Sequence, residues 1–80
     1  MNYDTDRIDE MTLALMYLVM SRGREGGLAW KGLDWLTMAR LEQKGWISDP
    51  KVKGATVRVT SGGMKRAEEL FRKHFQTRAL

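Results

Sequence analysis

The side chains of this chain that could carry out chemistry are few and lie far apart in the sequence. His74 is the only histidine, and it falls on the apolar face of a predicted helix, where packing is commoner than proton transfer. The glycine-rich segment 23–27 lacks the Gly-Lys-Ser/Thr ending of a phosphate-binding loop, and no catalytic motif surrounds Ser21, Ser48 or Ser61. We therefore expect neither catalysis nor a cofactor.

Four acidic side chains near the start could in principle hold a hard cation: Asp4, Asp6, Asp9 and Glu10. Their spacing is not that of a calcium-binding loop. Acids at the start of a helix cap its free N–H groups and match the positive end of its dipole. We therefore expect helix capping here and no metal site.

Length and composition predict one small domain that needs additional support. Eighty residues bury a limited share of their surface, and with no cysteine a disulfide cannot compensate, so oligomerisation is the expected supplement. The longest apolar run, Leu13 to Met20, is eight residues, against about 20 for a membrane span. We expect a single domain over 1–80, ordered over about 5–75, in the cytoplasm and without membrane association.

The net charge of +4 is unevenly distributed along the chain. Residues 1–40 carry five basic and six acidic side chains, whereas residues 41–80 carry nine and four. Clustered Lys and Arg favour phosphate-bearing partners because binding releases condensed counterions. An ordinary solvated surface is the alternative explanation for so small an excess.

A helix is predicted from about Asp6 to Ser21, with two apolar faces. One face carries Ile8, Met11, Leu15, Leu18 and Val19, and the nearly opposite face carries Leu13, Met16, Tyr17 and Met20. A small core rarely covers both faces, so a helix from a second copy of the chain is expected to cover the second face. Cover by the C-terminal helix of the same chain is the alternative.

Residues 22–33 contain four glycines and no helical period, which predicts a loop with at most one turn around Leu28 to Trp30. This segment is too short and too rich in glycine for the first helix of a helix-turn-helix. The absence of this first helix counts against DNA binding. Trp30 is expected to plug the space left by that helix, with an exposed contact residue as the alternative.

A second helix is predicted from about Asp34 to Lys44, with Asp34 at its start. Its narrow polar arc holds Thr37, Arg40 and Lys44, which are residue types that can contact bases or phosphates in a DNA groove. Any surface helix can present the same arc. Trp35 falls on the apolar side and is expected in the core.

The segment 41–70 predicts a helix end, a β-hairpin and a new helix. Gly45 favours the left-handed conformation that ends a helix. Strands are expected at Trp46 to Ser48, with Trp46 in the core, and at Ala55 to Thr60, where Val57 and Val59 alternate with polar neighbours. The last helix begins near Thr60 or Ser61, either of which can cap it. We expect Leu41, Ile47, Val57 and Val59 to share one core.

This order of elements, with the spacing Leu41-x-x-Lys44-Gly45-Trp46-Ile47 and Val57-x-Val59-Thr60-x-x-Gly63-x-x-x-Ala67-x-x-Leu70, resembles winged-helix regulators of the multiple-antibiotic-resistance and phenolic-acid-repressor types. The resemblance implies a mostly helical α+β fold with three helices and a two-stranded wing. It would place Thr37, Arg40 and Lys44 at the major groove and Lys51, Lys53 and Arg58 on the backbone of DNA. Over its whole length the chain resembles a small bacterial family of uncharacterised proteins.

Two functions follow as hypotheses. The first is a dimeric, DNA-binding transcriptional regulator of winged-helix type, with double-stranded DNA as partner. The second is a protein interaction or dimerisation module that no longer binds DNA, in which the second apolar face of the first helix, that of Leu13 and Tyr17, forms the working surface together with Trp30. In either case Leu13, Met16, Tyr17 and Met20 are the expected dimer contacts.

Overall fold

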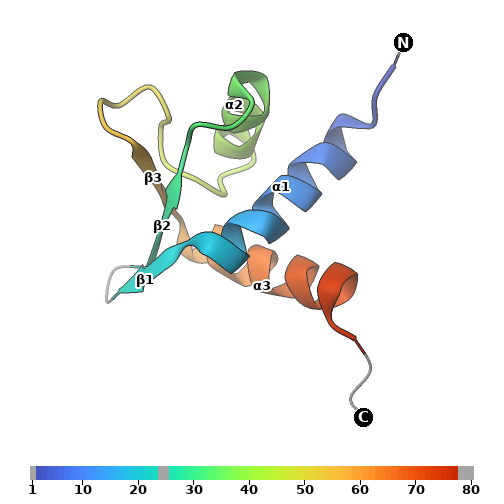
Figure 1. The fold of residues 1–80 in the computed structure, drawn as a ribbon. Helices are drawn as coiled ribbons and strands as arrows, with labels where there is room; N and C mark the ends of the chain where they lie inside the picture. Colours follow the sequence, from blue (N-terminus) through green and yellow to red (C-terminus); the bar gives the residue numbers. More distant parts are fainter. Residues whose placement is uncertain (1, 24–25, 78–80) are drawn as a thin grey trace.

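The computed structural model describes residues 2–23 and 26–77, which form three helices and a three-stranded antiparallel sheet. The elements in chain order are α1 (Thr5–Val19), β1 (Ser21–Gly23), β2 (Gly26–Trp30), α2 (Trp35–Gln43), β3 (Thr56–Val59) and α3 (Ser61–Phe75), as Figure 1 shows. Helices α1 and α3 cross and pack together beside the sheet, and α2 packs against α1. The mixed α+β, mostly helical class expected from the sequence is confirmed.

The three predicted helices are present, and their ends follow the local signals. Asp4 caps α1 by accepting a hydrogen bond from the N–H of Arg7 (3.0 Å), and the Thr60 hydroxyl accepts one from the N–H of Gly63 (2.9 Å) at the start of α3. Helix α2 ends at Gln43 with Lys44 as its C-cap, and the following Gly45 has a left-handed φ of 77°; the next N–H, that of Trp46, donates to the Leu41 carbonyl (3.0 Å).

The prediction of a loop over residues 22–33 is wrong, because β1 and β2 occupy most of it. Strand β2 alternates as a half-buried strand does, but with its small residues inward: Gly27 and Ala29 are buried, whereas Leu28 and Trp30 are exposed. A Cβ on Gly27 would lie 2.4 Å from the Met20 sulfur, so side chains arriving from the helices fill the space that large strand residues usually occupy. A pattern built on large apolar residues therefore does not detect this strand.

The predicted two-stranded hairpin is also corrected. Strand β3 pairs with β2, placing Val57 opposite Ala29 and Val59 opposite Gly27, rather than with a full strand at Trp46 to Ser48. That segment contributes one isolated bridge between Ile47 and Val59. The sheet order is β1-β2-β3, so the chain builds three strands where the sequence predicted two.

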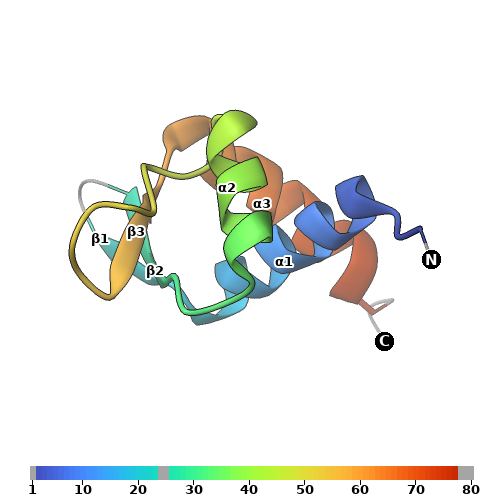
Figure 2. The ribbon, with the colours of Figure 1, turned by 90° about the horizontal axis from the view of Figure 1, so that it is seen from above.

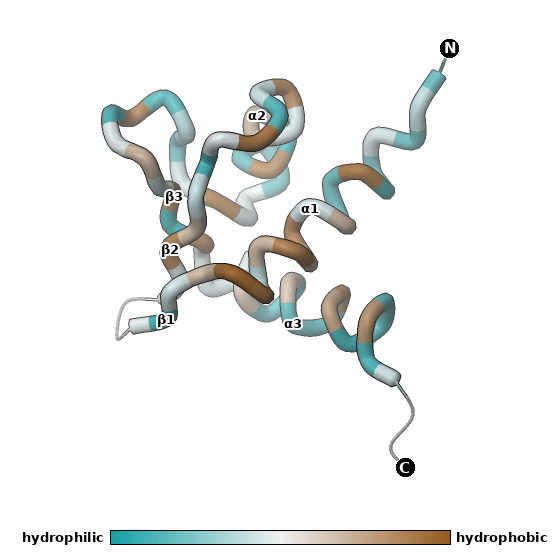
Figure 3. The backbone as a smooth tube through the Cα atoms, viewed as in Figure 1, coloured by the Kyte–Doolittle hydropathy of each residue, from teal (hydrophilic) through white to brown (hydrophobic). Residues whose placement is uncertain are grey.

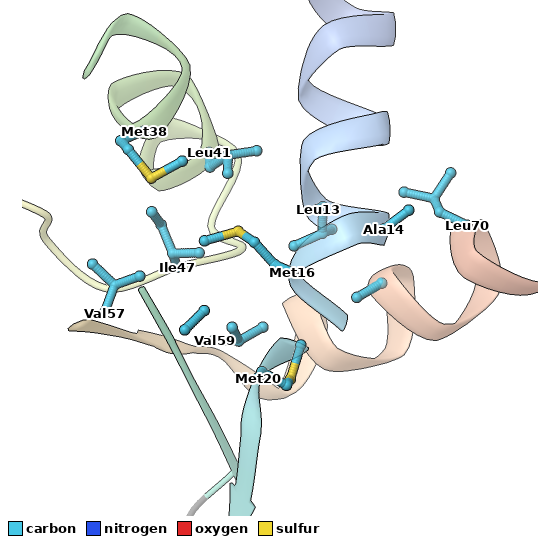
Figure 4. Close-up of a cluster of buried hydrophobic side chains, with 12 residues drawn as sticks. Leu13, Ala14, Met16, Met20, Met38, Leu41, Ile47, Val57, Val59 and Leu70 are labelled. Carbon is cyan, nitrogen blue, oxygen red and sulfur yellow. The ribbon is translucent and has the colours of Figure 1, made fainter. Parts of the chain in front are cut away.

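The core lies where the helices meet the inner face of the sheet. Figure 4 shows Met16 of α1 directed toward Ile47 and Val59, with Met38 and Leu41 of α2 above them. The predicted shared core is confirmed, because Leu41, Ile47, Val57 and Val59 are each at most 2% exposed. Of the tryptophans expected inside, Trp46 is half-buried against this core, but Trp35 is 54% exposed because it begins α2 on the outer side.

Gly63 in the first turn of α3 is required by close packing. A Cβ on it would lie 2.0 Å from the carbonyl oxygen of Trp46, which also accepts a hydrogen bond from Thr60, whereas a Cβ on Gly62 meets no atom within 4 Å. We expect Gly63→Ala to lower the free energy of unfolding by about 1 to 3 kcal/mol through overpacking. Gly62→Ala should raise it by up to about 1 kcal/mol by restricting the unfolded chain. Urea denaturation of both variants measures this contrast, and equal effects would contradict it.

Candidate functional site

The expected DNA-contacting arc of α2 faces α1 and is occupied by ion pairs. Arg40 Nε donates to both carboxylate oxygens of Asp9 (2.8 and 3.0 Å), and Lys44 Nζ donates to Asp9 Oδ2 (2.7 Å) and Asp6 Oδ1 (2.9 Å). The Asp9 side chain has no exposed surface. We call Asp6, Asp9, Arg40 and Lys44 the α1–α2 ion-pair cluster; its two carboxylates balance its two cations.

Thr37 is also committed to this contact region. It is 1% exposed, its hydroxyl donates to Asp34 Oδ2 (2.8 Å), and it accepts a hydrogen bond from Arg40 Nη2 (3.1 Å). The expectation that Thr37, Arg40 and Lys44 form an outward arc for a DNA groove is therefore corrected. The polar face of α2 is needed to satisfy the buried carboxylate of Asp9.

Electrostatic effects on pKa values follow from these contacts. Burial lowers the pKa of Lys44, but its hydrogen bonds to Asp9 and Asp6 outweigh this, so the pKa lies above the ordinary value. The hydrogen bond and charge of Lys44 lower the pKa of Asp6. Hydrogen bonds from the Thr37 hydroxyl and N–H lower the pKa of Asp34. The charged forms of these groups are therefore favoured by the fold.

The remaining expected DNA contacts lie elsewhere. Lys51 and Lys53 are exposed on the loop 48–55, and Arg58 is exposed on the outer face of β3. In Figures 1 and 2, α2 lies between this loop and α1. Lys31 holds this loop in place, because its Nζ donates to the carbonyls of Pro50 (2.8 Å) and Val52. The six residues thus do not form one surface patch.

The expected dimer contacts of α1 are corrected as well. Leu13, Met16 and Met20 are 0%, 1% and 8% exposed within the single chain, and Tyr17 packs on Phe71 of α3 with ring centroids 5.3 Å apart. A side chain with almost no exposed surface cannot contact a second copy. The alternative, in which the C-terminal helix covers this face of α1, describes the structure.

The other face of α1 is uncovered and borders an apolar groove of about 420 Å³. The connection between β2 and α2 forms the opposite wall. Six side chains supply most of the apolar lining, and they are 39 to 71% exposed: Ile8, Leu15, Leu18, Val19, Trp30 and Leu33. We call these six residues the α1 groove residues.

The groove continues as a shallower hollow of about 450 Å³ along the N-terminal half of α1, past Met11 and Ile8 to Tyr3. Figure 3 shows hydrophobic segments recurring along α1, the strongest where the helix ends. The apolar surface therefore runs the length of the helix. Its deeper part lies at the C-terminal half, beside Trp30 and Leu33.

The sequence indicated most residues of this groove, but it placed the expected interface on the opposite face of α1. The stripe of the groove on α1 was one of the two predicted faces, and Trp30 was named as either a plug or a contact residue. Trp30 is 59% exposed with its ring against Gly32, so the plug is wrong. Leu33 was not predicted. It precedes the Asp34 cap, where an apolar residue often packs on the helix that follows, and that signal could have identified it.

The α1–α2 ion-pair cluster yields a stability prediction. Asp9→Asn leaves two partly buried cations without their shared carboxylate, so we expect the free energy of unfolding to fall by about 2 to 4 kcal/mol, below the full cost for a wholly buried pair because both cations retain solvent contact. Asp6→Asn is the matched control: its side chain is 84% exposed, so its replacement should lower the free energy of unfolding far less than Asp9→Asn does. Chemical denaturation at neutral pH compares them. Equal losses of unfolding free energy in the two variants would show that the burial of Asp9 does not set the cost of its replacement.

Together the fold and the groove define a small α+β domain with one helix face left open. The sequence profile of a family described as "Domain of unknown function (DUF6429)" matches residues 4–77, and the chain belongs to this family. It is 44% identical over 75 residues to the "Uncharacterized protein y4hR" of Sinorhizobium fredii (strain NBRC 101917 / NGR234), a match that covers 94% of this chain and 97% of the relative. No solved structure matches the chain. Among the described residues, no helix is long and apolar enough to cross a membrane.

Proposed function

We propose that this chain is a non-catalytic self-association module of winged-helix-like architecture, whose α1 groove binds a second copy of the chain. The uncovered apolar face of α1 is the observation that carries this proposal. Its six groove residues present on the order of 600 Å² of apolar surface, at the upper end of the largest patch found on a typical monomer. A patch of this size favours contact with another protein surface.

The area also favours a second copy as the occupant. If two such patches were buried completely, the interface would remove on the order of 1,200 Å² from solvent, the lower end of the range for stable protein interfaces. A single 80-residue domain without cysteine has a small core and no disulfide, and association through this face would add apolar burial without any other partner.

The order of elements supports the winged-helix-like architecture. The three strands of a winged helix correspond here to β2, to the bridge at Ile47 and to β3. Helix α2 precedes the loop 48–55, and α3 follows β3. Between β2 and α2 there are only four residues, where such regulators carry another helix. We infer that the space of that missing helix is left open here as the groove beside Trp30 and Leu33.

Leu18→Asp tests self-association. Leu18 is 63% exposed in the single chain, so the variant should fold, but a buried carboxylate in the interface should weaken the dimer at least 100-fold, about 2.7 kcal/mol. Sedimentation velocity at micromolar concentrations measures the shift. Val52→Asp, at a 64% exposed position on the loop 48–55, is the matched control and should leave the dimer intact. A wild-type chain that sediments as a monomer throughout would refute the proposal.

Duplex DNA binding through the loop 48–55 is a second candidate function. The observation in its favour is that Lys51 and Lys53 are exposed and form no ion pair within the described residues, on a loop held by Lys31. Without Arg40 and Lys44, which pair with α1, such binding would contact phosphates and carry little sequence preference.

Replacing Lys51 and Lys53 with Ala tests this second function. If these lysines contact DNA, the variant should bind every duplex more weakly, and the log-log salt slope should fall by about 0.9 for each phosphate that a lysine no longer neutralises. Lys65→Ala with Lys73→Ala on α3 removes the same charge elsewhere and serves as the control. Fluorescence polarisation with unrelated duplexes measures both. Absence of binding at roughly 50 mM salt would remove this candidate.

A further inference from the structure

We propose that the second copy binds in an antiparallel arrangement, in which the N-terminal half of one α1 enters the groove beside Trp30 and Leu33 of the other. This inference rests on the proposed self-association and adds its geometry. In a two-fold interface the same surface appears on both copies, so any hollow on one must be filled by a projection of the other. The two halves of the α1 surface differ in this respect, because Trp30 and Leu33 wall only the C-terminal half.

The shape of the α1 surface is the first argument. At the C-terminal half of the helix the groove is walled by Trp30 and Leu33, whereas the hollow along the N-terminal half is lined by α1 and the residues just before it. Figure 1 shows the start of α1 projecting away from the sheet, on the side opposite β1. Antiparallel packing places each projecting N-terminal half against the partner's walled half. Parallel packing would bring the two walled halves together and leave the projecting halves with less to contact.

The polarity of α1 is the second argument. Its acidic side chains give no charged end, because Asp6 and Asp9 pair with Lys44 and Arg40, and Glu10 pairs with Arg66. Parallel packing of two α1 helices would place like ends of their dipoles side by side. Antiparallel packing instead places the positive start of each helix beside the negative end of the partner's helix. The helix dipoles therefore favour the antiparallel arrangement.

The register of the two α1 helices follows from the residues of α1 that line the groove. Ile8 and Val19 are the two ends of the groove lining on α1 and lie about 16 Å apart along the helix. A two-fold axis through the middle of this stripe places Ile8 opposite the partner's Val19 and Thr12 opposite the partner's Leu15. All four residues line the groove.

Disulfide trapping tests this register directly, because the chain contains no cysteine of its own. An equimolar mixture of the Ile8→Cys and Val19→Cys variants should form at least tenfold more cross-linked dimer under mild oxidation than either variant alone. A Thr12→Cys and Leu15→Cys mixture should also cross-link, and it tests the register again if replacing Ile8 weakens association. Val52→Cys, exposed on the loop 48–55, measures linkage by random collision.

The outcomes separate this inference from the function on which it rests. Efficient cross-linking of Ile8→Cys to itself, and of Val19→Cys to itself, would show a parallel dimer and overturn the antiparallel arrangement while self-association stands. Cross-linking no greater than that of Val52→Cys in a chain that sediments as a dimer would place the interface elsewhere and overturn the inference. A monomeric wild-type chain would overturn the proposed function itself.

Discussion

The buried carboxylate of Asp9 is the interaction on which the rest of the structure depends. A carboxylate without exposed surface must be paired, and here both partners come from α2, so α2 is held with its polar side against α1. This orientation turns Met38 and Leu41 into the core and leaves Trp35 and Leu36 exposed. It also pairs Arg40 and Lys44 with carboxylates of α1, so these cations are not available to a nucleic acid. One buried charge on α1 therefore shapes both the packing of α2 and the functions open to it.

Much of the fold was predictable from local signals. The three helices, their caps at Asp34 and Thr60, the stop at Gly45 and the burial of Val57 and Val59 all follow from residues within a few positions of one another. Strand β2 was not predictable in this way. Its inward residues are glycine and alanine because Met20, at the end of α1, and Met64 of α3 fill the space beneath Gly27. The character of this strand is therefore set by helix side chains that no local pattern contains.

The candidate site, like the fold, was predictable only in part from local sequence. That α1 carries two apolar faces was evident from its sequence period, but which face the chain covers depends on where α3 docks. Tyr17 packs against Phe71 of α3, more than fifty positions away, and such long-range contacts between α1 and α3 bury the inner face. Likewise, the residue types of Arg40 and Lys44 suited DNA, but an acidic partner on another helix already held them. Composition limits the available interactions, whereas tertiary neighbours decide which of them are used.

The short connection from Trp30 to Leu33 joins two regions that otherwise lie apart. Trp30 and Leu33 wall the groove, while Lys31 between them holds two carbonyls of the loop 48–55, and its backbone N–H donates to Ala55 (3.1 Å). The loop and the groove wall therefore share one mechanical support. A lengthened or shortened loop would move these carbonyls out of reach of the Lys31 ammonium and weaken the support of the connection between Trp30 and Leu33. The length of the loop 48–55 therefore affects the position of the groove wall beside α1.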